Sequence, residues 1–246
     1  MAFTNWRGLV GCVHPTLRPG STEEVVKLLP EGVGVLSLYN DIKRGDKTEF
    51  EAVMKGYEKH IALLAEQKCD IIHPSGAPPF MVQGLAKEAD LVKKWEDMFQ
   101  VPIFTSGQNQ ITALKALGAK SIIGVTYFPG DINDVFSQYF TDAGFNVKCM
   151  VGMDVPFNRA QELPGEQVYA FIKKLYRQFG GADAIYMLGS GWRTLHIIHM
   201  LEQDLEIPVL HPQTARVWEM QRRLLIREKK QGYGVLLETM PPLPTH

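Results

Sequence analysis

Short apolar segments and longer amphipathic segments alternate along almost the whole chain. The apolar segments are partly β-branched, which is typical of parallel strands buried on both faces. We therefore expect strands at residues 9–13, 34–38, 70–72, 102–104, 121–125, 147–151, 184–188 and 208–210. The amphipathic segments predict helices near residues 22–29, 48–67, 85–99, 107–117, 131–143, 165–178, 193–204 and 213–230. A βαβα order of this kind folds into a mostly parallel sheet with helices on both faces.

The series of strands and helices starts twice. "WRGLVGCVHP" (6–15) opens the first series, and "KALGAKSIIGVTYF" (115–128) opens a second one halfway along the chain. We therefore predict an α/β protein with two pseudo-symmetric, flavodoxin-like halves, each built on a parallel sheet, and with the active-site cleft between them. The first half is predicted to hold residues 1–117 and 213–246, because the last helix returns to it. The second half is predicted to hold residues 118–212.

The composition argues against several classes of partner. A net charge of -1 and an isoelectric point near 6.7 argue against a protein that binds nucleic acid or a membrane surface. No apolar run approaches the roughly 20 residues that a membrane helix needs, and the N-terminus lacks the pattern of a signal peptide. Three cysteines without metal-ligand spacing fit a reducing compartment. The sequence therefore predicts a cytoplasmic protein with a small-molecule partner, and leaves a homo-oligomer open.

Polar and glycine-rich residues follow several of the predicted strands. These strand ends are "CVHPT" (12–16), "IIHPSGAPP" (71–79), "VTYFPGD" (125–131), "MLGSGWRTL" (187–195) and "VLHPQT" (209–214). The carboxyl ends of parallel strands meet at one edge of a sheet, so these segments are expected to face each other across the cleft. The "GSGW" turn could bind an anion at the start of a helix, although tight packing explains such a turn at least as well.

Three histidines share one pattern. His14, His73 and His211 each end a predicted strand, and each is followed by proline. Imidazoles at one edge could act as general acids or bases, because they titrate near neutral pH. They could also bind a divalent metal with an open position for water. The alternative is structural: His-Pro can simply end a strand, with the ring hydrogen-bonded to a carbonyl group.

The strand ends, together with "MLGSGWRTLHIIHMLEQDLEIPVLHPQTARVWEMQR" (187–222), resemble the aspartate/glutamate racemase superfamily. Within it, the chain is most similar to the branch of arylmalonate decarboxylase and maleate cis-trans isomerase. The similarity includes Arg193-Thr194-Leu195, Pro208 and Trp218. "SGAPPFMVQG" (75–84) corresponds to the first active-site loop of that branch, and "VTYFPGDIND" (125–134) to the loop that opens its second half.

The resemblance implies a small carboxylate held in the cleft, and no cofactor. It also places the two catalytic cysteines of the superfamily at Gly76 and Gly189, so both thiols are absent from this chain. Two-thiol racemisation and thiolate addition to a double bond are therefore excluded. In the first loop, Ala77 takes the place of a hydroxyl side chain, and Pro78 and Pro79 lack the N–H groups that could hold an oxyanion.

The sequence therefore predicts a cysteine-independent enzyme that acts on a small carboxylate or carbonyl compound. The expected reaction is a decarboxylase-like lyase or isomerase step through an enolate-type intermediate. A hydrolase of an amide, imide or lactone, with or without a divalent metal, is the first alternative, and a non-catalytic carboxylate-binding protein is the second. The candidate catalytic residues are His14, His73, Ser75, Tyr127, Ser190 and His211. The candidate substrate-binding residues are Gly76, Ala77, Phe128, Gly189, Gly191 and Trp192.

Overall fold

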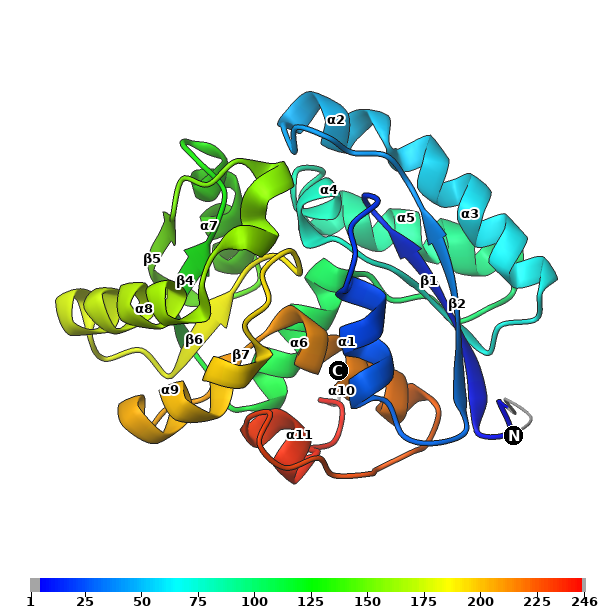
Figure 1. The fold of residues 1–246 in the computed structure, drawn as a ribbon. Helices are drawn as coiled ribbons and strands as arrows, with labels where there is room; N and C mark the ends of the chain where they lie inside the picture. Colours follow the sequence, from blue (N-terminus) through cyan, green and yellow to red (C-terminus); the bar gives the residue numbers. More distant parts are fainter. Residues whose placement is uncertain (1–4, 245–246) are drawn as a thin grey trace.

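A computed structural model describes residues 5–244, so the outermost residues of the predicted first half, 1–4 and 245–246, lie outside it. The chain folds into two parallel sheets with helices packed around them (Figure 1). One sheet has the strand order β2-β1-β3, and the other has the order β5-β4-β6-β7. The strands are β1 (Gly8–His14), β2 (Val33–Tyr39), β3 (Ile71–Pro74), β4 (Ser121–Thr126), β5 (Asn146–Gly152), β6 (Ala184–Met187) and β7 (Val209–Leu210).

The predicted strand at 102–104 appears as a single parallel bridge between Ile103 and Ile72. This bridge takes the place of a fourth strand in the first half. Across the sheet of each half, the strands then lie in the order second, first, third, fourth. The prediction of two pseudo-symmetric parallel-sheet halves is therefore confirmed.

Helices lie close to the positions that the amphipathic segments predict. The first group is α1 (Ser21–Leu28), α2 (Lys47–Ala52), α3 (Met54–Glu66), α4 (Ala77–Met81), α5 (Leu85–Phe99) and α6 (Ser106–Ala116). The second group is α7 (Ile132–Asp142), α8 (Gly165–Phe179), α9 (Ile198–Leu205), α10 (Pro212–Arg223) and α11 (Val235–Thr239), with short 3-10 helices η1 (Phe157–Glu162) and η2 (Leu195–Ile197). Helices α4 and α11 and the short η1 were not predicted. Of these, α4 is the one that contains prolines. Its two prolines stand in the first turn, where the N–H groups have no partner within the helix in any case.

Helix α10 is shorter than the predicted 213–230. It ends at Arg223 because Leu225 adopts a left-handed conformation, with a φ of 59°, and the N–H of Ile226 bonds back to the carbonyl of Gln221 at 2.7 Å. Before that point almost every residue of α10 is buried, because the helix packs against both α1 and α6. In Figure 1, α6 and α10 lie near the centre of the molecule, between the two sheets.

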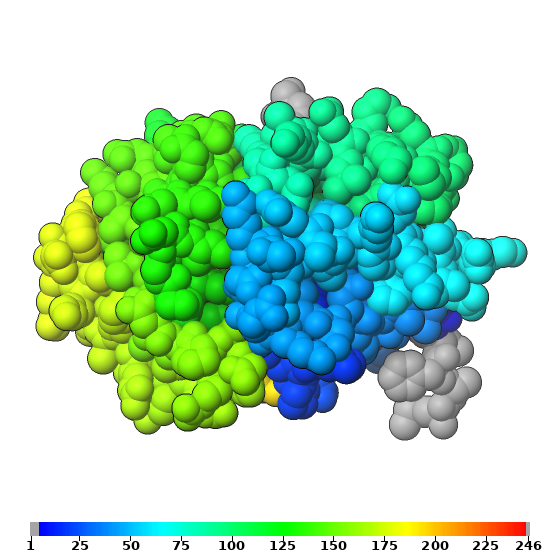
Figure 2. Space-filling view, turned by 90° about the horizontal axis from the view of Figure 1, so that it is seen from above, coloured from blue at the N-terminus to red at the C-terminus, as the bar shows by residue number. Residues whose placement is uncertain are grey.

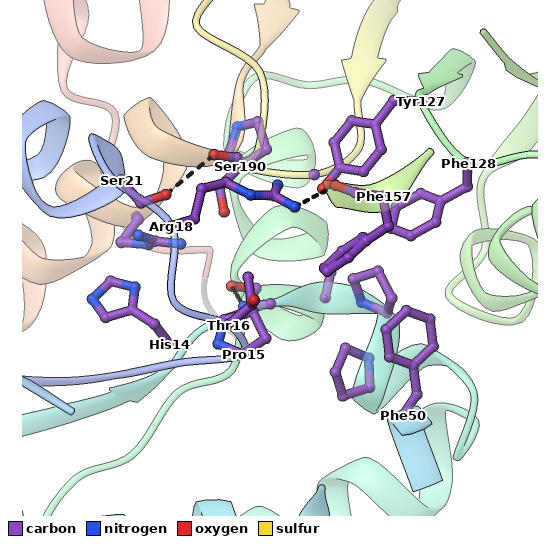
Figure 3. Close-up of a pocket in the computed structure, with 18 of the residues that line it drawn as sticks. His14, Pro15, Thr16, Arg18, Ser21, Phe50, Tyr127, Phe128, Phe157 and Ser190 are labelled. Atoms are coloured by element: carbon purple, nitrogen blue, oxygen red, sulfur yellow. Dashed lines mark hydrogen bonds between the residues drawn. The ribbon is translucent and has the colours of Figure 1, made fainter. Parts of the chain in front are cut away.

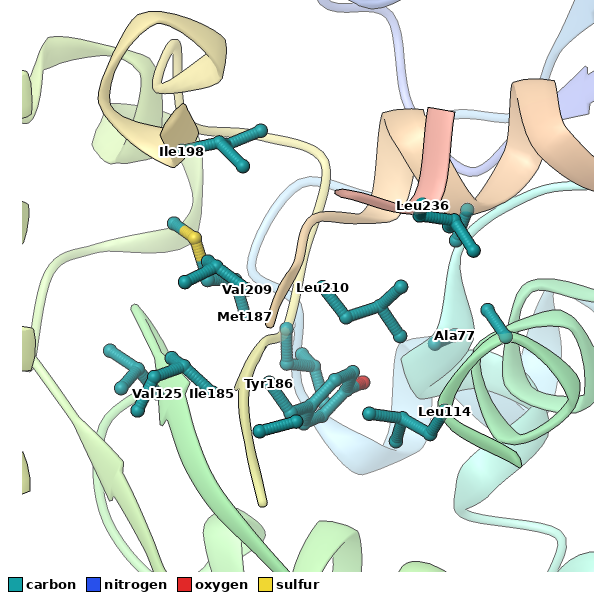
Figure 4. Close-up of a cluster of buried hydrophobic side chains, with 14 of the residues drawn as sticks. Ala77, Leu114, Val125, Ile185, Tyr186, Met187, Ile198, Val209, Leu210 and Leu236 are labelled. Atoms are coloured by element: carbon teal, nitrogen blue, oxygen red, sulfur yellow. The ribbon is translucent and has the colours of Figure 1, made fainter. Parts of the chain in front are cut away.

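One apolar core continues from one half into the other. Leu210 and Tyr186 of the second sheet lie beside Leu114 of α6 (Figure 4), and all three are fully buried. The Tyr186 hydroxyl also donates to Gln110 Oε1 at 2.6 Å. Burying each large apolar side chain contributes about 1.5–3 kcal/mol, so the shared core holds the two sheets, and the cleft between them, in a fixed geometry. No helix within residues 5–244 combines the length and the apolar character needed to cross a bilayer.

Candidate active site

A small cavity lies where the strand ends of the two halves meet (Figure 3). Its volume is about 30 Å³. The predicted site residues that line it are His14, Gly76, Ala77, Tyr127, Phe128, Gly189 and Ser190. The other predicted site residues, His73, Ser75, Gly191, Trp192 and His211, are buried around it.

Aromatic rings form one side of the cavity. Tyr127 stacks on Phe128 with ring centroids 4.6 Å apart, and Phe157 lies 5.9 Å from Phe128. Phe50 of α2 approaches Phe157 of η1 at 6.5 Å across the boundary between the halves. The view from above shows the segment that contains α2, in blue, in contact with the green surface of the second half (Figure 2). A ligand therefore meets an apolar, aromatic wall on this side.

His14 lies on the opposite side of the cavity (Figure 3). Its Nδ1 is 3.3 Å from Ser75 Oγ, and its Nε2 is 3.3 Å from both Thr22 Oγ1 and Ser37 Oγ. Burial lowers the pKa of His14 to about 3, and the charge of Arg216 adds to this effect. The imidazole is therefore neutral near pH 7, and it can exchange hydrogen bonds with a ligand but does not supply a positive charge.

The hydroxyl of Tyr127 stands next to Gly189. The φ of Gly189 is +100°, and a Cβ built there would lie 2.4 Å from Tyr127 Cε1 and 2.6 Å from its Oη. The phenol thus fills the space into which a side chain at position 189 would project. Burial raises the pKa of Tyr127, while the Arg18 guanidinium and the N–H of Gly191 lower it in part because they stabilise the phenolate. The Trp192 ring packs edge-on against the Tyr127 ring, with the two ring centroids 5.3 Å apart.

His73 does not line the cavity but positions a residue that does. Its Nδ1 is 2.8 Å from the carbonyl oxygen of Phe104, and its Nε2 is 3.2 Å from Ser106 Oγ. The Ser106 hydroxyl in turn accepts a hydrogen bond from the N–H of Gly76 at 3.0 Å. Burial, aided by the charge of Arg216, holds the pKa of His73 well below its usual range. The sequence left open that a His-Pro strand end is structural, with the ring hydrogen-bonded to a carbonyl group. The contact between His73 and the Phe104 carbonyl is an arrangement of this kind.

His211 caps helix α10. Its Nδ1 accepts a hydrogen bond from the N–H of Gln213 at 3.1 Å, and its Nε2 has no partner among the described residues. Burial lowers the pKa of His211 to about 3, again with a contribution from Arg216. Within residues 5–244, no three His, Cys, Asp or Glu side chains are grouped so that they could hold a metal ion. The three-histidine metal site that the sequence left open is therefore not formed.

Two arginines in the cavity wall were missed by the sequence analysis. Arg18 stacks on the Phe157 ring at 4.6 Å and donates to the Phe157 carbonyl oxygen. Arg216 of α10 lines the cavity although only 1% of its surface is exposed. Arg18 lies in no recognisable motif, and Arg216 lies within the 187–222 stretch but was not singled out there. Arg216 falls in the middle of a helix, so its position in the site depends on how that helix is packed.

The three cysteines lie outside the cavity. Burial raises the pKa of Cys12, Cys69 and Cys149 to about 11 in each case. At neutral pH these thiols are protonated, and none of them reaches the site. Chemistry that does not use cysteine stays a prediction.

Comparison with known proteins gives consistent results. A family model described as arylmalonate decarboxylase matches residues 24–237. Maleate isomerase Iso from Pseudomonas putida S16, with maleate, has a TM-score of 0.88 and 20% identity over 94% of this chain and 97% of that one. A double mutant of arylmalonate decarboxylase in its liganded form has a TM-score of 0.86 and 17% identity, over 94% and 99%. Nocardia farcinica maleate cis-trans isomerase bound to TRIS has a TM-score of 0.85 and 20% identity, over 94% and 98%. No curated protein matches the sequence significantly.

Proposed function

Because the chain belongs to the arylmalonate decarboxylase family, we propose that it is a cysteine-independent lyase or isomerase of small carboxylates. The reaction passes through an enolate-type intermediate in the cavity between the halves. Tyr127, rather than a thiol, transfers the proton. The matched proteins are decarboxylases and isomerases, which favours this function over the hydrolase alternative.

The position of the Tyr127 hydroxyl carries the proposal. The sequence resemblance assigns the second catalytic cysteine to position 189, which is glycine here. The phenol occupies the space beside Gly189, 2.6 Å from where a Cβ would lie. A proton donor is therefore present close to where the resemblance places the missing thiol.

Decarboxylation of a malonate-type substrate illustrates the step. The bond between the α-carbon and one carboxylate breaks, CO₂ leaves, and the electron pair remains on the α-carbon and the second carboxylate as an enediolate. The Tyr127 hydroxyl gives its proton to the α-carbon, the phenolate takes a proton from water, and the hydroxide that remains combines with the released CO₂ as bicarbonate. Burial raises the pKa of Tyr127 and so favours return of a proton to the phenolate, while Arg18 and the N–H of Gly191 lower the pKa in part.

The remaining predicted residues support this step. His14 and Ser190 also line the cavity and carry polar atoms that can hydrogen-bond to a ligand. His73 and His211 act as positioning residues, the first through Ser106 and the second through the start of α10. Loss of CO₂ and the proton transfer that follows require no cofactor in this proposal, and the three free cysteines support the cytoplasmic location expected from the sequence.

The test is turnover of phenylmalonate and maleate, followed by NMR in D₂O, where decarboxylation places deuterium on the α-carbon. We expect Tyr127→Phe to lower kcat by at least about 100-fold, the usual contribution of a general acid. Tyr139→Phe is the matched control, because it also removes a buried phenol hydroxyl, but one that lies outside the cavity. Unchanged kcat in Tyr127→Phe would exclude the phenol as the proton donor. A wild-type protein that consumes neither substrate would contradict decarboxylation and isomerisation of these dicarboxylates.

A further inference from the structure

Arg216 is a buried cation without a partner. Its Nε and Nη1 atoms are shielded from solvent and have no hydrogen-bond partner among the described residues. No carboxylate of residues 5–244 lies within 4.0 Å of its guanidinium. Arg223, two turns later on the same helix, is different, because its Nη2 lies 2.8 Å from the buried Glu219 carboxylate.

The groups around Arg216 do not neutralise it. The three strand-end histidines near it are held in their neutral form by burial. Glu24 is the carboxylate with an electrostatic effect on Arg216, but it accepts a hydrogen bond from Gln213 Nε2 at 3.3 Å instead. Burial raises the pKa of Glu24, while Gln213 and the charges of Arg193, Arg216 and Lys27 lower it in part. The cavity wall therefore carries a positive charge with no opposite charge in contact.

An unpaired charge in the interior destabilises a folded protein. An opposite charge that pairs with it offsets much of this cost. Arg216 lines the cavity of the candidate active site, so a ligand can reach it. A guanidinium also binds carboxylates through two parallel N–H groups, which fixes the orientation of the ligand.

We propose that Arg216 binds the carboxylate group of the ligand and thereby selects for anionic substrates. This assignment rests on the proposed function, which it makes more specific. The substrate is then an organic acid with its carboxylate at Arg216 and an apolar or aromatic portion against Tyr127, Phe128 and Phe157.

This role accounts for the altered first loop. Ala77, Pro78 and Pro79 all line the cavity, yet they offer neither a hydroxyl nor, for the prolines, an N–H group to an oxyanion. Arg216 approaches the same cavity from α10 and supplies charged N–H donors. The donors that a carboxylate requires would thus come from the last long helix rather than from the loop after β3.

The experiment compares equilibrium binding of phenylacetate and its neutral analogue phenylacetamide by calorimetry, with purified full-length protein. We expect the wild-type protein to bind phenylacetate at least about 30-fold more tightly, and Arg216→Met to lose this preference. Arg216→Lys should keep part of it, because the charge remains but the paired N–H geometry does not. Arg223→Met, on the same helix, should keep all of it.

Thermal stability gives a second measurement. An arginine with a purely structural role would stabilise the protein, so its replacement would lower the Tm. Without ligand, Arg216→Met should melt at or above the wild-type Tm, because an apolar side chain replaces an unpaired buried charge. Arg223→Met should melt below it, because the buried Glu219 carboxylate loses its charged partner and keeps only the hydrogen bond from Asn109 Nδ2. A lower Tm in Arg216→Met with an unchanged phenylacetate preference would overturn the assignment, as would a wild-type protein that binds the acid and the amide equally.

The outcomes separate this inference from the proposed function, because binding is measured without turnover. If phenylacetate binding depends on Arg216 but phenylmalonate is not consumed, the role of Arg216 in binding carboxylates is supported and the proposed decarboxylation is wrong. If phenylmalonate is consumed and Arg216→Met leaves its KM unchanged, the enzyme assignment stands and the role of Arg216 is wrong.

Discussion

A buried carboxyl group outside the active site gives a prediction whose size follows from the structure. Glu88 of α5 is fully buried and accepts hydrogen bonds from Thr105 Oγ1 and from the Tyr139 hydroxyl. Tyr139 belongs to α7, so the carboxyl group links the two halves of the molecule. Burial raises the pKa of Glu88 to about 7, although the two hydroxyls and the N–H of Gln108 lower it in part.

The sign of the effect on stability follows from the proton balance. Between the ordinary pKa of 4.5 and the folded value of about 7, the folded protein holds a proton on Glu88 that the unfolded chain releases. The contribution of Glu88 to stability is therefore complete below pH 4.5 and is lost as the pH rises through 7. A difference of about 2.5 pH units corresponds to about 3 kcal/mol, since each unit is worth about 1.4 kcal/mol.

Urea unfolding at several pH values between 5 and 8 tests this with Glu88→Gln, which mimics the protonated form. The free energy of unfolding of Glu88→Gln, minus that of the wild type, should rise by up to about 3 kcal/mol across this range. All other titratable groups are the same in the two proteins, so their contributions to the pH dependence of the free energy of unfolding cancel in this difference. Glu58→Gln is the control: hydrogen bonds from Trp95 and Lys94 lower the Glu58 pKa, so its difference should be flat in this range. A flat difference for Glu88→Gln would refute the role of burial.

Two further predictions concern the site. Gly189→Ala should abolish turnover and destabilise the fold by about 2–4 kcal/mol, because a Cβ would overlap Tyr127 and the backbone is left-handed. Gly130→Ala is the control, because Gly130 has a φ of +64° but open space around it, and it should lose about 1–2 kcal/mol of stability. If thermal unfolding shows the same loss of stability for both variants, the overlap with Tyr127 is not the cause. Acid should destabilise the protein as the pH falls from 6.5 toward 3, because the buried imidazole of His211 stays neutral while the unfolded chain gains protons. His211→Asn retains a side chain that can cap α10 and should reduce this loss by up to about 5 kcal/mol, measured by urea unfolding at each pH, whereas an unchanged acid response would contradict the argument.

The fold could be predicted from the sequence because its signals are local. A buried parallel strand needs a continuous apolar run, and a helix packed on it needs an apolar stripe, so both leave a pattern in a short segment. The exceptions depend on single turns. The two prolines of α4 can begin a helix as well as prevent one, and the left-handed residue that ends α10 is a leucine, which gives no sequence signal.

The site could be predicted only in part. Strand ends meet at one edge by topology, which brought His14, Gly76, Tyr127 and Gly189 to the same cavity. Topology does not decide where a side chain points. His73, at the end of the neighbouring strand, therefore turns away from the cavity to the carbonyl of Phe104.

The sequence by itself determined the parallel α/β architecture, the edge at which the site lies and the absence of thiols at positions 76 and 189. Each of these follows from residue type and order along the chain. Only the tertiary structure decided that the Tyr127 phenol fills the space beside Gly189 and that Arg216 reaches the cavity without a counter-ion. These contacts join residues far apart in the chain, and whether a charge is paired depends on three-dimensional packing that no local pattern records.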